Sequence, residues 1–469
     1  MKTIYRYTAL IMMTVFILSF SCYAANPADE GAALPANMIR VGLYYGIETK
    51  VEVSLETDAE LGYRIGFYDE SRTLHALGSI PNTSVVVAPN TNATLSDHTV
   101  CGIHLRLPAS FQTFDEAKQS ASANGGFPAF CNGLFYVMIG SYASSEDAQS
   151  ALAQLGREAE IYYDGGRGVV VLAQNSDQPL FLFDYASTHA LVLSPHDSSQ
   201  KPVTKCDGNR YYGDFQFNRV TPSGMTVVNC VLLEDYVKGV VPNEMSASWP
   251  EEALKAQAVC ARTFALKNLN RYRIYGFDVS DDTYSQVYRG LLNADDSTNA
   301  ACEATAGEVL RYQGELCSVY YFAADGGATQ SAETVWNDVK VPYLKGIADP
   351  YESDMSFYCK SWSTGVSRGQ FGEIKAEYDS NGNVLSVKVG DKVYRNDLVR
   401  DFLVLAGAPY NSRHFTLTYQ KDSDSYYIQG SGFGHNLGMS QWGAYAMAQE
   451  HGMSYQDILS FYFTGAVVS

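Results

Sequence analysis

The spacing of hydrophobic residues changes along the chain. Residues 38–92 contain short runs that alternate apolar and polar positions, such as "KVEVSLE" and "SVVVAP", and residues 180–236 carry similar signals. Both stretches predict β-strands, which are antiparallel in the first stretch. From residue 248 the period becomes helical; Ser248 and Glu251 predict a capping box, with Pro250 in the first turn. The pattern predicts an α+β fold in which a mixed, β-rich domain packs against helices.

Residues 97–175 contain what looks like a tandem duplication. "GIHLRLPASFQTFDEAKQSASANGGFPAF" and "FYVMIGSYASSEDAQSALAQLGREAEIYY" share a strand, a Ser-rich turn, an acidic helix start, an Ala-rich helix and a second strand. The acidic starts are Asp115-Glu116 and Glu146-Asp147. Two strand–helix–strand units in tandem predict a small βαββαβ domain.

Residues 1–24 are predicted to be a signal peptide. Lys2 and Arg6 precede an apolar run, and Cys22 and Ala24 occupy the −3 and −1 positions of a cleavage site. The apolar run is about long enough to span a bilayer, so an uncleaved anchor is the alternative. We therefore expect an exported, secreted protein at an extracytoplasmic, cell-wall or membrane-associated location.

Composition narrows the choice of partners. The 469 residues carry a net charge of −18, which argues against nucleic acid and against binding anionic wall polymers by charge alone. Eight of the nine cysteines follow the signal, and this even number permits disulfides in 105 pairings, although an unpaired buried thiol is the simpler expectation for Cys260. No CxxC or HExxH motif occurs, so neither a metal site nor a cofactor is predicted.

Two segments carry candidate chemistry. "VVPNEMSASWPEEALKAQAVCARTFAL" places Glu244 in a loop before an Ala-rich helix, an arrangement that can hold a catalytic group still. "GSGFGHNLGMSQWGAYAMA" surrounds His435 with glycines and then starts a helix near Ser440; the glycines suit close approach of a ligand or of another chain segment. Taken singly, a lone glutamate is more often a solvated residue, and a glycine loop is more often a turn.

These segments resemble the stage II sporulation protein D family (SpoIID/LytB). "LLEDYVKGVVPNEMSASWPEEALKAQAVCARTFAL" is similar to its first signature, and "GSGFGHNLGMSQWGAYAMA" is similar to its end motif. Between them, "FDVSDDTYSQVYRG" and "EATAGEVLRYQGELCSVYYFAADGGATQSAETVW" are similar to the middle of the family. The resemblance covers residues 179–469, and "IRVGL" within 38–92 is similar to the opening strand. The second unit of the 97–175 insert resembles a SPOR domain, a peptidoglycan-binding module; a purely structural insert is the alternative.

The resemblance implies a lytic transglycosylase, which is a lyase acting on peptidoglycan. Such enzymes cut the bond from N-acetylmuramic acid to N-acetylglucosamine in peptide-free glycan strands and leave 1,6-anhydro ends. Glu244 occupies the position of the catalytic acid in the family's first signature. The resemblance also implies substrate-binding or supporting roles for His435, Ser440, Gln441, Lys255, Arg262 and Gln286. Of these, Lys255, Arg262 and Gln286, together with Gln257, match motif positions that could equally be structural.

A lone carboxylate suits this chemistry. Glycoside hydrolases that use water need two carboxylates, whereas a transglycosylase takes its nucleophile, the C6 hydroxyl, from the substrate. One glutamate can then act as acid and afterwards as base, provided that burial near Met245 and Trp249 raises its pKa well above about 4.3. The nearby Glu234 and Asp235 are expected to cap a helix.

One departure from the family bears on metal binding. Phe322 occupies a position where many members carry histidine, and no Cys or His lies between Phe322 and Gly327, so we predict no zinc, with Cys317 as the sole remnant of such a site. The alternative function is a non-catalytic activator of a peptidoglycan amidase, as the name LytB implies; a purely structural wall protein is a third. The expected partners are glycan strands and, for the activator, an amidase.

Overall fold

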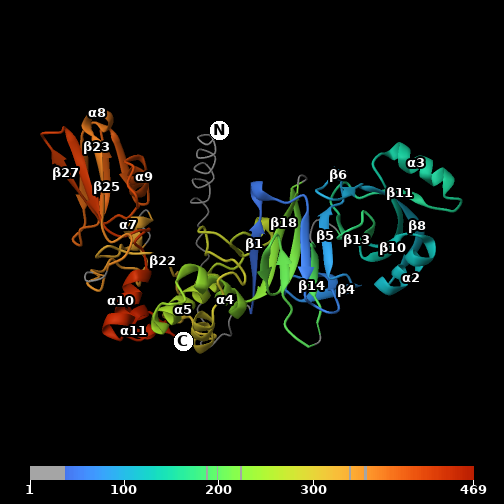
Figure 1. Cartoon of the computed structure of the whole chain (residues 1–469), viewed down its shortest axis with the longest axis horizontal. Helices are drawn as coiled ribbons and strands as arrows, with labels where there is room; N and C mark the ends of the chain where they lie inside the picture. The colour runs from blue at the N-terminus through green and yellow to red at the C-terminus, as the bar shows by residue number, and fades with distance from the viewer. Residues whose placement is uncertain (1–36, 186–188, 198, 222–223, 337–339, 353–355) are drawn as a thin grey trace. The chain divides into compact units, whose positions relative to one another are not determined.

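The computed structural model describes residues 37–185, 189–197, 199–221, 224–336, 340–352 and 356–469 (Figure 1). It contains mixed helices and strands, so the predicted α+β class is confirmed. The predicted signal peptide falls within residues 1–36 and lies outside the described residues. Across the described ranges, no helix is long and apolar enough to cross a membrane.

One sheet has seven strands in the order β19-β1-β18-β17-β14-β3-β4. All neighbours in it are antiparallel except β1 and β19. Strand β18 is buried along almost its whole length, and it leads directly into the helix that carries Glu244. The strands are β1 (Met38–Tyr44), β3 (Tyr63–Tyr68), β4 (Leu74–Ile80), β14 (Leu191–Pro195), β17 (Asp214–Thr221), β18 (Gly224–Leu232) and β19 (Val279–Ser280).

A second sheet has ten strands in the order β11-β8-β10-β9-β13-β12-β5-β2-β15-β16. The opening stretch, expected to form antiparallel strands, is thus divided: β2 and β5 pair here, whereas β1, β3 and β4 lie in the other sheet. The strands are β2 (Val53–Thr57), β5 (Ser84–Pro89), β8 (Ile103–Phe111), β9 (Phe127–Cys131), β10 (Leu134–Tyr142), β11 (Glu160–Tyr163), β12 (Val169–Ala173), β13 (Pro179–Asp184), β15 (Thr204–Cys206) and β16 (Asn209–Tyr211).

The duplicated stretch forms the order β8-α2-β9-β10-α3-β11, with helices α2 (Phe114–Asn124) and α3 (Ser145–Gln154). Thr113 starts α2 with a capping box, and Ser144 caps α3. Both helices pack on one face of their strands, where Ala121 and Ala148 join a buried cluster with Leu105. This stretch is continuous with the larger sheet, because β9 pairs in parallel with β13.

Helix α5 (Glu251–Lys267) is the centre of the helical group. Its alanines at 253, 256, 258, 261 and 265 are fully buried, and the small side chains let α4, α6, α10 and α11 pack against it. Figure 1 shows α4, α10 and α11 beside α5. The surrounding helices are α4 (Leu233–Glu244), α6 (Asp296–Ala304), α10 (Gln441–His451) and α11 (Tyr455–Tyr462).

The start of α5 corrects one prediction. No capping box forms, because Pro250 rather than Ser248 is the N-cap residue. The main-chain oxygen of Pro250 accepts from Ala253 and Leu254, while the Ser248 hydroxyl bonds with that of Ser246 (2.9 Å). The capping template was matched in sequence, but the helix begins two residues later than the template requires.

Residues 362–430 form a small module with its own core of Trp362, Phe402, Phe415 and Ile428. Its elements are β23 (Trp362–Ser367), α8 (Arg368–Phe371), β24 (Ile374–Tyr378), β25 (Val384–Val389), β26 (Lys392–Arg395), α9 (Leu398–Leu405), β27 (Phe415–Gln420) and β28 (Ser425–Gly430). The sequence did not separate this module from its surroundings.

Shorter elements are η2 (Gly46–Glu48), β6 (Ala93–Thr94), β7 (Thr99–Val100), η3 (Arg273–Tyr275), β20 (Leu310–Tyr312), β21 (Glu315–Leu316), β22 (Tyr321–Phe322), α7 (Ala332–Val335), β29 (Met439–Ser440) and β30 (Val467–Val468).

The eight cysteines in the described residues are all free. Cys260 is fully buried within α5, as expected. Hydrophobic packing, rather than cross-linking, therefore holds these elements together.

Candidate active site

Glu244 is the last residue of helix α4. We predicted a loop at this position; instead, the helix continues past Pro242 and ends where Met245 donates its N–H to Val241. The last turn is firmly packed, because Val240 and Val241 are fully buried and Met245 is 2% exposed. Glu244 therefore follows a well-packed helical turn.

The two oxygens of the Glu244 carboxylate differ. Oε1 accepts a hydrogen bond from the main-chain N–H of Val287 (2.9 Å) and another from the hydroxyl of Tyr321 (3.2 Å). The side-chain amide of Gln441 also hydrogen-bonds the carboxylate. Since the residue is only half-buried, one oxygen is anchored by the protein and the other can turn towards a ligand.

The loop that carries Val287 packs closely on α4 because of Gly239. A Cβ at Gly239 would lie 2.4 Å from the ring of Tyr288, which no real side chain tolerates. The glycine lets Tyr288 stack on Tyr236 of the same helix, with ring centroids 5.2 Å apart. This close packing places the N–H of Val287 against Glu244.

Burial raises the pKa of Glu244 from 4.5 to about 7. The hydrogen bonds from Val287, Tyr321 and Gln441 favour the ionised form and oppose this rise. A carboxylic acid with a pKa near neutrality holds its proton in an appreciable fraction of molecules, and its conjugate base is equally available. The group is therefore suited to donate and to accept a proton within one reaction.

Gln286 reaches Glu244 through a tyrosine. Its Nε2 donates to the hydroxyl of Tyr321 (2.9 Å), and its Oε1 accepts from the hydroxyl of Tyr236 (2.9 Å). Because Tyr321 accepts from Gln286, its own proton is directed at Glu244. Gln286 is 1% exposed, so it positions Tyr321 rather than facing solvent.

The end motif reaches the residues around Glu244 through a short pair of parallel strands. Strand β22 pairs with β29, which aligns Tyr321 with Met439 and Phe322 with Ser440. Ser440 is the N-cap of α10, as expected, and its hydroxyl accepts from Gly443 (3.2 Å). The same hydroxyl donates to Glu352, so Ser440 faces away from Glu244 towards another acidic group.

Gln441 contacts Glu244 directly. Its Nε2 donates to the main-chain oxygen of Glu244 (3.2 Å) and to Oε1 of Gln257 (3.4 Å). Gln257 lies on α5 and is fully buried. Gln441 thus ties the start of α10 to the end of α4.

The glycines of the end motif admit another chain segment, one of the two alternatives left open by the sequence. Gly438 has φ of 82°, and a Cβ there would lie 2.1 Å from the main-chain oxygen of Tyr320. At Gly434, with φ of 128°, a Cβ would lie 2.7 Å from the Cβ of Phe322. Strand β22 could not reach the end motif if these positions carried side chains.

His435 lies next to β22. Its ring centroid is 5.2 Å from that of Phe322 and 6.3 Å from that of Tyr320, and it hydrogen-bonds the main chain of Tyr321. Burial lowers its pKa to about 4, so the ring is neutral at physiological pH. Among the described hydrogen bonds, none joins His435 to Glu244.

Two candidates on α5 lie elsewhere. Arg262 is fully buried and binds both carboxylate oxygens of Glu234 (2.8 and 2.7 Å), which is a structural arrangement. Lys255 pairs with Glu251 (2.7 Å) and Glu252 (2.8 Å) on its own helix. Neither side chain contacts Glu244 in the described structure.

The expected capping role of Glu234 and Asp235 is wrong. Leu232 is the N-cap residue of α4 and makes no side-chain cap bond. Glu234 instead pairs with Arg262, and Asp235 pairs with Lys201. Both carboxylates still lie in the first helical turn, where negative charge is favourable.

Sequence reasoning missed Tyr321, Tyr236 and the main chain of Val287. The chain has 34 tyrosines, and nothing in the spacing of these two distinguishes them. The single available signal was Phe322, which drew attention to the segment containing Tyr321. A main-chain donor leaves no signal in side-chain identities.

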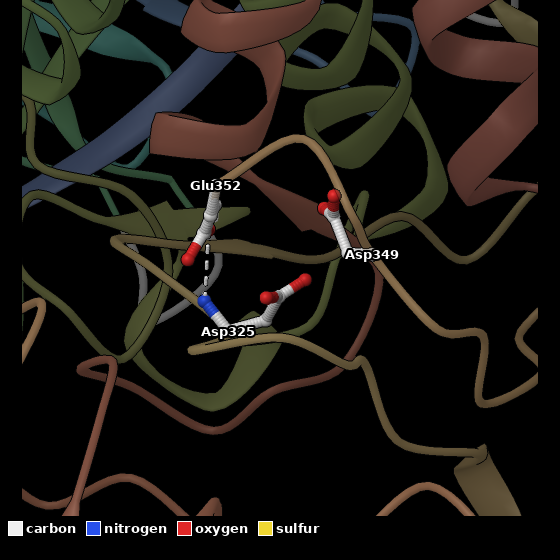
Figure 2. A group of neighbouring side chains, drawn as sticks. All are labelled: Asp325, Asp349 and Glu352. Carbon is white, nitrogen blue, oxygen red and sulfur yellow. Dashed lines mark hydrogen bonds between the residues drawn. The ribbon is translucent and has the colours of Figure 1, made fainter. Parts of the chain in front are cut away.

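A second acidic group bears on metal binding, which the sequence did not predict. Asp325, Asp349 and Glu352 are buried, and each offers a ligand atom within 4.8 Å of the others. Figure 2 shows the three carboxylates approaching one another, with Asp349 and Glu352 on one short segment and Asp325 on another. Cys317, the expected remnant of a zinc site, is not one of these groups.

Comparisons with known proteins agree with this geometry. A family model described as "Stage II sporulation protein" matches residues 221–312. An uncharacterized protein of Brachyspira hyodysenteriae is 40% identical over 276 residues, covering 55% of this chain and 72% of the relative. Stage II sporulation protein D of Bacillus amyloliquefaciens is 31% identical over 271 residues, covering 52% and 75%. The chain belongs to the stage II sporulation protein D family.

The amidase enhancer of Bacillus subtilis is a further relative of this chain and is 30% identical to it over 394 residues. The match covers 71% of this chain but 54% of the enhancer, so the chain spans about half of that relative. The segment matched by the family model contains Glu244, Gln286 and Val287. Tyr321 and Gln441 lie beyond it, so the contacts of Glu244 are completed by residues outside the matched segment.

Proposed function

We propose that the protein is a lytic transglycosylase that cleaves peptide-free peptidoglycan strands between N-acetylmuramic acid and N-acetylglucosamine, in sporulation or cell-wall remodelling. The observation that carries the proposal is the state of Glu244, a half-buried acid whose pKa is raised to about 7. Among the described residues, the groups that shift this pKa include no second carboxylate. Hydrolases that activate water need a second carboxylate within about 5–10 Å, so a single acid favours a nucleophile from the substrate.

The reaction then needs one group to move a proton twice. Protonated Glu244 donates to the glycosidic oxygen as the C1–O bond breaks and N-acetylglucosamine leaves with a free 4-hydroxyl. The C6 hydroxyl of N-acetylmuramic acid attacks C1, and the Glu244 carboxylate accepts its proton. The product carries a 1,6-anhydro ring, no water is consumed, and Glu244 is again protonated.

The anchored oxygen explains how the acid keeps its orientation. Val287 and Tyr321 hold Oε1, so Oε2 is assigned the proton transfer. Both donors favour the carboxylate, while burial favours the acid. This balance suits a group that must act in both forms.

An aromatic surface beside Glu244 supports glycan binding. The ring of Trp442, which follows Gln441, lies 4.7 Å from that of Trp249 and stacks on Phe357 at 5.1 Å. Tyr445 completes the group at 5.4 Å from Trp442. The four rings are half-buried, and flat apolar faces with polar edges suit sugar rings. We assign this surface to sugar units flanking the cleaved bond.

We further propose that residues 97–175 act as a SPOR-like glycan-binding module. The strand face opposite α2 and α3 carries Arg106 against the rings of Tyr136 (4.7 Å) and Tyr162 (4.8 Å). Stacked aromatic and guanidinium groups offer flat surfaces to an uncharged polymer. Such a module would hold the same strand that Glu244 cleaves, at the exported location expected from the sequence.

The second candidate is a non-catalytic activator of a peptidoglycan amidase. It is favoured by the match to the amidase enhancer over 71% of this chain. An activator would keep glycan binding but would gain nothing from a carboxylate held partly protonated.

One experiment separates the two functions. In one reaction the protein is incubated with purified denuded glycan. In a second reaction it is incubated with intact peptidoglycan, with and without an added amidase. The products of both reactions are analysed by mass spectrometry. Anhydro ends without the amidase, absent with Glu244→Gln, support the transglycosylase. Faster release of stem peptides by the amidase with no anhydro ends, and equally with Glu244→Gln, supports the activator instead.

A further inference from the structure

Asp325, Asp349 and Glu352 form a closed acidic cluster that the proposed reaction does not use. Their exposed fractions are 0%, 3% and 3%, and no ion pair between described residues includes any of the three. Lys360 donates to the main-chain oxygen of Glu352 (3.1 Å). Three buried acidic groups thus lie close together, as Figure 2 shows.

Hydrogen bonds orient two of the carboxylates completely. Glu352 accepts from the N–H groups of Asp325 (3.1 Å) and Gly326 (3.0 Å) and from the Ser440 hydroxyl. Asp349 accepts from the N–H of Tyr351 (2.9 Å) and the hydroxyl of Tyr462 (2.5 Å). These donors come from well-separated parts of the chain and fix each carboxylate plane.

Asp325 is different. Its Oδ1 accepts from the N–H of Gly327 (2.7 Å), but Oδ2 is buried and has no hydrogen-bond partner among the described residues. A buried anionic oxygen without a donor is strongly unfavourable unless a charge of opposite sign reaches it. The orphaned oxygen belongs to the set of groups that could bind one ion, with Asp349 and Glu352 as the other ligands.

The spacing suits a large, hard cation. Carboxylate oxygens bind Ca²⁺ at about 2.3–2.6 Å, so ligands across one ion are up to about 5 Å apart. Around Mg²⁺, with bonds of about 2.0–2.1 Å, the same separation is at most about 4.2 Å. The ligand atoms of the cluster lie within 4.8 Å of one another, a bound that accommodates Ca²⁺ and does not by itself exclude Mg²⁺. All are oxygens rather than the nitrogen or sulfur that zinc prefers.

We propose that Asp325, Asp349 and Glu352 form a binding site for a hard divalent cation of the calcium class. The ion supplies the positive charge that the orphaned oxygen of Asp325 lacks. The competing arrangement is a proton shared between Asp325 and Asp349, since burial and the two neighbouring carboxylates raise the pKa of Asp325 well above its usual range. A shared proton neutralises one carboxylate, whereas a divalent ion neutralises two and engages all three.

The cation links the site to the neighbouring pocket without touching it. Glu352 binds Ser440 at the start of α10, and the next residue, Gln441, holds the main chain of Glu244. Asp325 follows β22, which carries Tyr321. The ion therefore braces the two segments that position Glu244, as a structural ion would.

The test is thermal unfolding of the full chain after treatment with a chelator. Added Ca²⁺ at millimolar concentration is expected to raise the midpoint by at least about 3 °C, with smaller shifts for Mg²⁺. Isothermal titration of the same protein with Ca²⁺ should give a single class of sites. Since unfolding and titration involve no cleavage, the result is independent of the proposed transglycosylase reaction.

Variants locate the site. Asp325→Asn and Glu352→Gln should each remove the calcium-induced shift and the heat of binding. The matched control is Asp164→Asn, which changes a buried carboxylate (2% exposed) whose oxygens are satisfied by Asn90, Gly166 and Gly168. It should retain the full shift. If a cluster variant does not fold, the titration of the unaltered chain still decides whether the cation binds.

Three outcomes would overturn the proposal. They are a midpoint that responds to pH but to none of the divalent ions, a shift produced by Zn²⁺ alone, and a calcium shift that survives both Asp325→Asn and Glu352→Gln. The first would assign the cluster to a shared proton, and the last would place the ion elsewhere in the chain.

Discussion

The pocket of Glu244 and the cluster of Asp325, Asp349 and Glu352 solve the problem of burying acidic groups in opposite ways. Glu244 is half-buried, no second carboxylate is among the groups that shift its pKa, and Val287 and Tyr321 both donate to the same oxygen, Oε1. The cluster is closed to solvent, and most of its oxygens are held by N–H and O–H donors. A carboxylate with a raised pKa is available for proton transfer in the first setting and is locked in the second.

The two regions share their supporting segments. Ser440 serves the cluster and the adjacent Gln441 serves Glu244, because successive residues at the start of α10 point in different directions. Likewise, Tyr321 contacts Glu244, while Asp325 follows a few residues later in the same segment. Residues that are close in the sequence thus have different roles: one contacts Glu244, and the other belongs to or contacts the acidic cluster.

The largest expected effect is on cleavage, through Glu244→Gln. The amide has the same shape but cannot donate the proton, so the rate of formation of anhydro ends should fall by about 100- to 10,000-fold. The midpoint of thermal unfolding should stay the same or rise, because a buried charge is removed. Mass spectrometry of the products gives the rate.

The matched control is Glu251→Gln, an exposed glutamate that begins the next helix. It should leave the rate unchanged. A Glu244→Gln variant that retains more than a tenth of the activity would remove Glu244 from the acid role, and the contrast between pocket and cluster would then lose its chemical meaning.

The next effect concerns a third way of burying charge, in which an arginine neutralises the carboxylate. Arg262→Met should lower the free energy of unfolding by about 3 kcal/mol, because it breaks a bidentate pair with Glu234 and removes the donor to the main-chain oxygen of Glu308. Lys255→Met, on the same helix, should cost at most about 1 kcal/mol. Urea unfolding measures both.

The pH profile of cleavage is the control for this pair. It should be the same in Arg262→Met as in the unaltered protein, measured where both are folded. A displaced profile would mean that Arg262 acts on Glu244, and its assignment to structure would be wrong.

A somewhat smaller effect is the dependence of stability on pH. The pKa of Glu244 is about 7 in the folded protein and 4.5 as its ordinary value, so the folded state disfavours the charged form. The contribution of Glu244 to the free energy of unfolding is fully present below about pH 4.5. It is lost as the pH rises through about 7, and the loss is on the order of 2–3 kcal/mol. Denaturant unfolding across this window should show the loss.

Glu244→Gln isolates this contribution, because the cluster titrates identically in both proteins. The difference in unfolding free energy between the variant and the unaltered chain should grow in favour of the variant from about pH 4.5 to about pH 7. Parallel curves would show that Glu244 is solvated, in contrast to the cluster.

Local signals predicted much of the fold. Alternation predicted β2 and β5, and a serine before a helical run predicted Ser440 as the start of α10, because such features depend on a few adjacent residues. The helix start at Pro250 was misjudged for the same reason. A capping template fixes residue types at a spacing, but tertiary packing decides where the helix begins.

The site was predictable only in part. Glu244 and Gln441 were candidates through family resemblance, yet their contact depends on α10 packing on α5. Tyr321 escaped notice because its position rests on the pairing of β22 with β29, which are far apart in the sequence. The acidic cluster escaped because Asp349 and Glu352, three residues apart, match no metal-binding motif, and Asp325 joins them only in the folded chain.

The smallest expected effect tests the donor that distinguishes the pocket from the cluster. Tyr321→Phe removes a hydrogen bond to the ionised form of Glu244, so the pKa of Glu244 should rise by up to about one unit. Because the acid must be protonated to act, the alkaline limb of the pH–rate profile should move to higher pH by the same amount.

The matched variant is Tyr462→Phe, which removes the corresponding donor to Asp349 (2.5 Å). It should lower the unfolding midpoint without moving the alkaline limb, because the cluster supports the pocket but moves no proton in the reaction. If both variants displace the limb equally, the two acidic groups titrate together, and the division between a reactive carboxylate and a structural cluster fails.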